Sequence, residues 1–259
     1  MALPLLTSID GVVTPSDEAV LPLPDDGAFR GDGVFEVLRA YGTKLFALED
    51  HLDRLERSAA SIDLTLDRTS IESETLSLLE RAEGADCLVR IVATRAGRRI
   101  VTLENLLDHP PSISLATVTY SPTVILNGVK SLSYAANMQA TRIAKKAGAM
   151  EALLVMPDGS VLEAPTSTLF WVSRGKLRTT SLEVGVLDSI TRDRIIAALD
   201  VEAGRFQISD VMDASEAFLV STTREVQPVD SIDGRPIPTD PGEQTKASAE
   251  AFTAALAAQ

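Results

Sequence analysis

The sequence has very little of the chemistry that disulfide frameworks and metal centres need. Its 259 residues include one cysteine and two histidines. Cys87 has no partner for an internal disulfide, and its position beside the apolar run Leu88–Val92 predicts a buried side chain rather than a catalytic thiol. His51 and His109 stand in no recognisable ligand spacing, so we expect no metal site.

Positive charge is also scarce. The chain carries 24 lysines and arginines against 37 acidic residues, a formal net charge of -13. This balance argues against nucleic acid as a partner and favours a small-molecule substrate. Residues Met1–Leu6 have neither a basic flank nor a long apolar run, so we expect no signal peptide, no membrane segment and a cytoplasmic protein.

The pattern of apolar residues predicts strands and helices in alternation. In the first part we expect a hairpin that begins with strand Gly33–Tyr41, a helix from Leu48 to Ile62, a helix opened by a capping box at Thr69–Glu72, and strands Leu88–Thr94 and Ser112–Tyr120. The pattern restarts after Pro122, which predicts a domain of residues 1–122 and a second of residues 123–259. There we expect helices at Ala135–Ala147 and Thr191–Leu199, strand Glu216–Ser221, and a closing helix from Gly242.

Four polar sites interrupt these apolar elements. Lys130 lies between an apolar stretch and a helix, where an amine suits Schiff-base chemistry, although a solvated strand end is the ordinary alternative. Asp188–Arg192 opens a helix and suits a phosphate, or is a plain N-cap by Asp188 or Ser189. Ser221–Thr223 ends a strand with three hydroxyls, and Glu163 ends another with a carboxylate.

Taken in chain order, these segments resemble the class IV aminotransferases, a family that uses pyridoxal 5'-phosphate. The similarity covers nearly the whole chain, and it rests on five ordered matches: Gly31–Arg39 with His51–Leu55, Lys130–Ala147, Gly159–Phe170, Val186–Arg192 and Ser221–Val229. The resemblance implies an α+β fold of type IV. It has two domains, a small N-terminal α/β domain and a larger C-terminal β-barrel-like domain with flanking helices.

The same resemblance implies roles for individual residues. Lys130 would be the catalytic residue that attaches the cofactor and moves the substrate proton. The cofactor phosphate would be bound by Arg54, Thr191, Ile190, Ser221 and Thr222. Glu163 would contact the nitrogen of the cofactor ring, and Leu187 and Tyr134 would lie beside that ring. Substrate contacts would come from Arg30, Arg98 and Thr223.

Some positions depart from the family pattern. Thr168 stands where many relatives have asparagine, and Ser189 replaces the usual glycine before the Ile-Thr pair. D-amino-acid enzymes place an arginine and a histidine near residues 94–99; here the histidine is absent, and Arg98 or Arg99 could serve or could be solvated.

Two reactions are open to this fold. We expect an aminotransferase that moves an amino group from a branched-chain or D-amino acid to a 2-oxo acid. The alternative is 4-amino-4-deoxychorismate lyase, which releases pyruvate and 4-aminobenzoate, because Lys130–Met138 resembles some lyases closely. The segment Thr223–Pro228 favours transamination. The resemblance also implies a homodimer.

Overall fold

The computed structural model describes residues 3–237 and 241–259, which form two compact units. Unit 1 runs to Asp108 and also contains Val129–Tyr134; unit 2 contains His109–Gly128 and all residues from Ala135 onward. This division differs from the boundary expected between residues 122 and 123. The chain leaves unit 1 earlier than expected, and it returns there for the six residues around Lys130.

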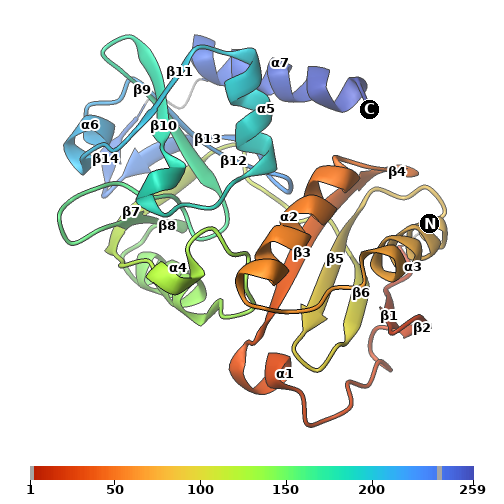
Figure 1. The fold of residues 1–259 in the computed structure, drawn as a ribbon. Helices are drawn as coiled ribbons and strands as arrows, with labels where there is room; N and C mark the ends of the chain where they lie inside the picture. Colours follow the sequence, from red (N-terminus) through yellow and green to blue (C-terminus); the bar gives the residue numbers. More distant parts are fainter. Residues whose placement is uncertain (1–2, 238–240) are drawn as a thin grey trace. The chain divides into compact units, whose positions relative to one another are not determined.

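Unit 1 is built on an antiparallel sheet (Figure 1). Its strand order is β2-β1-β6-β5-β3-β4. The strands are β1 (Leu6–Ile9), β2 (Val12–Pro15), β3 (Gly33–Tyr41), β4 (Lys44–Leu45), β5 (Cys87–Thr94) and β6 (Arg99–Glu104). Strand β3 has the predicted bounds, and it pairs along its length with β5, from Gly33 opposite Thr94 to Ala40 opposite Cys87.

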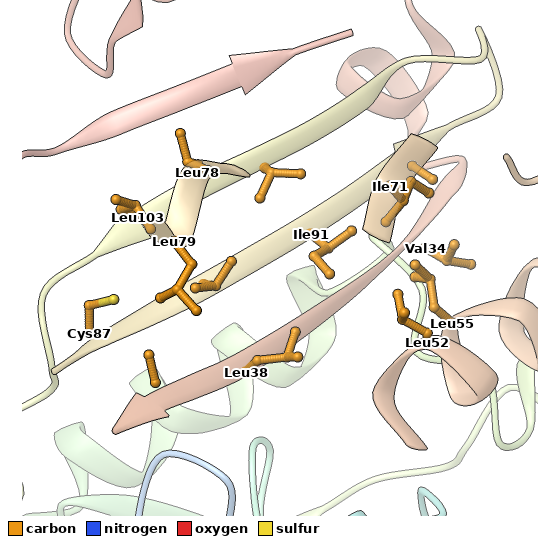
Figure 2. Packing of buried hydrophobic residues seen from close by; sticks show 14 of the residues in the cluster. Val34, Leu38, Leu52, Leu55, Ile71, Leu78, Leu79, Cys87, Ile91 and Leu103 are labelled. Carbon is orange, nitrogen blue, oxygen red and sulfur yellow. The ribbon is translucent and has the colours of Figure 1, made fainter. Parts of the chain in front are cut away.

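Helices α2 (Leu48–Ser61) and α3 (Arg68–Glu80) supply the apolar faces that close the core of unit 1, while α1 (Asp26–Arg30) is a short helix ahead of β3. Figure 2 shows side chains from both helices, such as Leu52 and Leu78, gathered with Leu38, Ile91 and Leu103 of the sheet. Cys87 is buried in this core, as its sequence context predicts. The predicted capping box at Thr69–Glu72 is wrong, because Asp67 is the N-cap of α3 and its carboxylate accepts the N–H of Ser70.

Unit 2 contains a mixed sheet with the order β11-β10-β9-β12-β13-β7-β8, and β14 pairs with β13. Its strands are β7 (Ile113–Thr119), β8 (Glu151–Val155), β9 (Thr168–Ser173), β10 (Lys176–Thr180), β11 (Val201–Gly204), β12 (Glu216–Ser221), β13 (Glu225–Ile232) and β14 (Arg235–Pro236). Every residue of β8 and β9 is buried, which explains their nearly continuous apolar sequence.

The two edge strands of this sheet are connected through the segment 160–163. Leu162 N–H donates to Leu154 O of β8, and Val161 N–H donates to Phe206 O, just beyond β11. The segment therefore lies between β8 and the chain after β11, which curls the sheet toward closure. This arrangement gives unit 2 the barrel-like character that the family resemblance implies, and it places Glu163 at the end of the connecting segment.

The helices of unit 2 are α4 (Ala135–Lys146), α5 (Ile190–Ala198), α6 (Ile208–Met212) and α7 (Glu243–Ala257), with 3-10 turns at Val124–Leu126 and Leu182–Val184. α4 packs on β7 and β8, α5 packs on α7 and β12, and α7 also packs on β13. Within the described ranges, no helix is long and apolar enough to cross a membrane.

Candidate active site

The backbone of Lys130 is fixed between β3 and α2 in unit 1. Its carbonyl accepts the Phe35 N–H at 3.0 Å, and its own N–H donates to Ser58 Oγ at 3.2 Å. The next residues extend the edge of β3, because Ser131 forms a bridge to Val34 and Leu132 N–H donates to Gly33 O. A lysine held in this way has little freedom to move its Cα, so its amine works from a defined position.

The side chain of Lys130 lies over an aromatic ring. Nζ is 4.5 Å from the centroid of the Phe35 ring, a distance that gives a cation–π attraction while the amine is protonated. Tyr134 packs edge-on against the same ring, with centroids 5.3 Å apart and planes at 86°. Phe35 therefore joins the two predicted residues Lys130 and Tyr134.

Strand β3 and helix α2 of unit 1 also contribute a buried group of three charged or polar side chains: Glu36, His51 and Arg54. Glu36 accepts hydrogen bonds from Arg54 at both oxygens, 2.7 Å from Nε to Oε1 and 2.7 Å from Nη2 to Oε2. His51 Nδ1 lies 2.8 Å from Glu36 Oε2. Because an ionised carboxylate only accepts, the Nδ1 of His51 carries the hydrogen. Glu36 and His51 are fully buried.

The pKa values of this group follow from its burial and charges. Burial by itself raises the pKa of Glu36, but the charge and hydrogen bonds of Arg54, with those of His51, overcome it and hold that pKa well below its ordinary value. Burial lowers the pKa of His51, although Glu36 opposes this shift, and nearby Lys130 adds to the lowering. The group is therefore a carboxylate and a guanidinium in contact with a neutral imidazole.

In unit 2, Glu163 is held by the backbone of another predicted residue. Its Oε1 accepts the N–H of Leu187 at 2.9 Å, so the carboxylate and Leu187 come together. Tyr120 lies close enough that its pKa is raised, first by burial and then by the charge of Glu163. Thr168, at the start of β9, is buried at 2% exposure.

The start of α5 has the features of an anion site. Ser189 is the N-cap, and its Oγ accepts the Arg192 N–H; of the two caps considered from the sequence, the structure uses Ser189. Thr191 is 1% exposed, and within the described residues its Oγ1 has no hydrogen-bond partner. A buried hydroxyl without a partner is costly, and a bound phosphate oxygen would satisfy it. Ile190 is the first helical residue.

The hydroxyl residues Ser221, Thr222 and Thr223 form the tip of the β12–β13 hairpin. Ser221 pairs with Glu225, which leaves a loop of Thr222, Thr223 and Arg224 between the strands. The Oγ atoms of Ser221 and Thr223 are 3.3 Å apart, and Ser221 Oγ accepts the Arg224 N–H at 3.2 Å. The hairpin thus brings together two predicted cofactor contacts and one predicted substrate contact.

The three arginines considered for the substrate carboxylate lie in unit 1. Arg30 is paired with Asp26 at the surface, and its side chain is 74% exposed. Arg98 contacts Asp10 at 2.7 Å, and Arg99 contacts Glu74 at 2.8 Å, so both are engaged by carboxylates of their own unit.

The sequence patterns assign no role to Glu36, His51 or Ser58. A signal existed for the first two: Glu36 is a charged residue inside an apolar strand, and His51 and Arg54 are three apart on a helix, hence on one face. No sequence signal marks Ser58, whose contact with Lys130 joins residues 72 positions apart.

A family model for the amino-transferase class IV proteins matches residues 33–232. The chain belongs to the class IV aminotransferases. It is thus an enzyme of a family that depends on pyridoxal 5'-phosphate, and the fold and activity that the sequence implies are confirmed. The buried Thr191 hydroxyl and the Glu163–Leu187 contact fit this cofactor.

Known proteins match the chain along most of their length. The chain is 32% identical to a Methanocaldococcus jannaschii protein that bears the name of a branched-chain-amino-acid aminotransferase (94% of each chain), and 28% identical to D-alanine aminotransferase of Bacillus licheniformis (92% of each). It is 27% identical to aminodeoxychorismate lyase of Bacillus subtilis, over 92% of this chain and 90% of the other. A solved branched-chain aminotransferase from Thermoproteus uzoniensis, with norvaline, has a TM-score of 0.86 at 27% identity, covering 96% and 93%.

Proposed function

We propose that Lys130 is the lysine that binds the cofactor of this aminotransferase, and that the enzyme moves an amino group from a branched-chain or D-amino acid to a 2-oxo acid. The observation that carries the assignment is the fixed backbone of Lys130, held by Phe35 and Ser58 with its amine against an aromatic ring. The names of the two aminotransferase relatives support the two substrate classes.

The unit 2 residues would hold the rest of the cofactor. Thr191, Ile190, Ser221 and Thr222 would donate to its phosphate, Glu163 would face the ring nitrogen, and Leu187 would pack on the ring; in unit 1, Arg54 would add a cation and Tyr134 a ring contact. When bound, pyridoxal phosphate withdraws electrons from the substrate α-carbon. Lys130 Nζ would take up the proton released there and later return it.

Substrate contacts belong to the same proposal. The side chain of Arg30 is the most exposed of the three candidate arginines. Because exposed ion pairs contribute little stability, Arg30 could leave Asp26 for a substrate carboxylate at the smallest cost in free energy. Arg98 would first have to leave Asp10. Thr223 presents its hydroxyl at the hairpin tip, beside Ser221.

The test follows the cofactor's near-visible absorbance after incubation with single D- and L-amino acids, with no acceptor present. Conversion to the pyridoxamine form would support transamination and give the handedness of the donor. Lys130→Ala should abolish the band of the bound cofactor, whereas Lys145→Ala, an exposed lysine of α4, should leave it unchanged. A Lys130→Ala protein with the wild-type band would refute the attachment site.

The lyase remains the second candidate, because the Bacillus subtilis lyase is nearly as similar to the chain as the D-alanine enzyme. Pyruvate release from 4-amino-4-deoxychorismate, with no conversion by any amino acid, would favour it. That result would leave the cofactor assignments in place.

We also propose a cytoplasmic homodimer. Val20, Leu23 and Phe29 of unit 1 are exposed apolar side chains, and a second copy would remove such surface from water. Light scattering on the purified enzyme checks the mass, and cell fractionation checks the location. An active monomer would refute the dimer.

A further inference from the structure

The residue that follows the Ser221–Thr223 hairpin tip, Arg224, forms a buried ion pair. Arg224 Nη2 is 2.8 Å from Glu151 Oε2, and the two side chains are 9% and 7% exposed. Arg224 Nη1 also donates to Gln227 Oε1 at 2.6 Å. The guanidinium is therefore engaged on two sides within unit 2, at the residue that follows the three hydroxyls.

The same ion pair is anchored to α4. Glu151 Oε1 accepts the hydroxyl of Thr141 at 2.5 Å, and one helical turn earlier Asn137 Nδ2 donates to Pro165 O at 3.0 Å. Residues four apart lie on one face of a helix. One face of α4 therefore contacts both the loop after Glu163 and, through Glu151, the hairpin tip.

The hairpin tip needs such an anchor. Glu225, which closes the loop, has a left-handed backbone with φ of 58°, a conformation that disfavours residues other than glycine. Within the loop, Ser221 Oγ accepts the Arg224 N–H at 3.2 Å and lies 3.3 Å from Thr223 Oγ1. A conformation of this kind persists where the surroundings fix it, and Arg224 connects the loop to Glu151 and Gln227 of the same unit.

We propose that the Arg224–Glu151 pair is a positioning pair, which holds the Ser221–Thr223 tip in the conformation that binds the cofactor phosphate. The inference rests on the proposed function, because it takes this tip as part of the phosphate site. Arg224 itself is not a ligand in this account, since Glu151 holds its Nη2 and Gln227 holds its Nη1. Burial lowers the pKa of Arg224, and the charge of Glu151 opposes that shift, which agrees with a cation kept by its partner.

Substituting Glu151 distinguishes two roles for Arg224, one as a positioning residue and one as a direct ligand of the phosphate. If Arg224 were a direct phosphate ligand, Glu151→Gln would release its charge and tighten binding. If the pair positions the hairpin tip, both Glu151→Gln and Arg224→Met loosen it and weaken binding. Arg178→Met is the matched control, because Arg178 on β10 forms a partly buried pair with Glu202 at 2.9 Å elsewhere in unit 2.

The experiment measures dissociation constants of pyridoxal phosphate and of pyridoxal, which lacks the phosphate, by absorbance titration of each variant. We expect Arg224→Met and Glu151→Gln to raise the constant for pyridoxal phosphate by about tenfold, the equivalent of one lost contact, and to change that for pyridoxal by less than about threefold. Arg178→Met should match the wild type. Amide hydrogen exchange without cofactor should be faster at residues 219–227 in both test variants.

Tighter binding by Glu151→Gln, equal losses for the two ligands, or unchanged exchange at residues 219–227 would overturn the positioning pair. If Arg224→Met does not fold, Glu151→Gln decides, because it preserves side-chain shape and an oxygen for Thr141. A wild-type protein that binds neither ligand would refute the proposed function instead. Hydrogen exchange would still decide whether the pair holds the hairpin tip.

Discussion

Replacing Glu36 by glutamine should destabilise unit 1 far more than the loss of one charge suggests. Glu36 is fully buried and receives two hydrogen bonds of 2.7 Å from Arg54 and one of 2.8 Å from His51. Glutamine preserves the shape, but its amide NH₂ must face a donor of Arg54 or His51, and Arg54 loses its counter-charge while buried. Breaking a buried pair in this way costs about 3–5 kcal/mol.

The assay must report on unit 1 alone. The chain has one tryptophan, Trp171, which is buried in unit 2, so its fluorescence follows unfolding of that unit. Amide hydrogen exchange on peptides of β3 and α2 follows unit 1 instead. We expect Glu36→Gln to speed amide exchange in these peptides by the factor that corresponds to the lost free energy of unfolding. The unfolding of unit 2, followed by Trp171 fluorescence, should change less.

Arg68→Met is the control in the same unit. Arg68 contacts Glu49, Asp53 and Glu56, but its carboxylate partners are 45–70% exposed, so the pairs are screened and worth about 1 kcal/mol or less. The reasoning is refuted if Glu36→Gln costs no more than Arg68→Met. A double variant, Glu36→Gln with Arg54→Met, should cost less than the sum of the single changes, because no buried charge is left alone.

Three further outcomes follow from the structure. Burial lowers the pKa of His51 from 6.5, so below that pH the unfolded chain binds a proton that the folded chain does not bind. The stability of unit 1 should therefore fall as the pH drops below 6.5. In urea unfolding measured at a series of pH values, His51→Gln should show a smaller loss of stability over this range. Gly33→Ala would put a Cβ 2.4 Å from Ala93 O and 2.7 Å from Leu132 Cδ1, and we expect a loss of about 1–3 kcal/mol in thermal unfolding; wild-type stability would contradict this packing. Burial raises the pKa of the Cys87 thiol, so a disulfide reagent should label it only after denaturation, and rapid labelling of the native protein would show that the site opens.

Local patterns in the sequence predict the elements whose side chains follow a simple period. Strands β3 and β12 have the predicted bounds, and the helix expected at Thr191–Leu199 is α5, one residue shifted. The sequence pattern predicts no strand at β13, which contains Pro228 opposite Phe218, and proline is a residue that is depleted in strands. The short strands β1 and β11 are stabilised by β6 and β10, which are distant in the chain and therefore absent from a local pattern.

The candidate residues of the site could be found from their order in the sequence, but their partners could not. Lys130 was singled out without the contact to Ser58, and Arg54 without Glu36. The expected boundary at residue 122 rests on a proline and a restart of the pattern. Pairing of Ser131 with Val34 links residues almost a hundred positions apart, so no local signal could show that the Lys130 segment returns to unit 1.

The return of Val129–Tyr134 to unit 1 has a consequence for the order in which the protein is made. During synthesis, β1 to β6 emerge first, but the edge of β3 at Gly33 and Phe35 receives its partners only when residues 130–132 leave the ribosome, after β7. A gene cut after residue 108 or 122 would encode a first unit that lacks Lys130 and leaves the edge of β3 at Gly33 and Phe35 without the partners from residues 130–132. The smallest fragment that completes this unit must reach Tyr134, and it must carry part of the second unit with it.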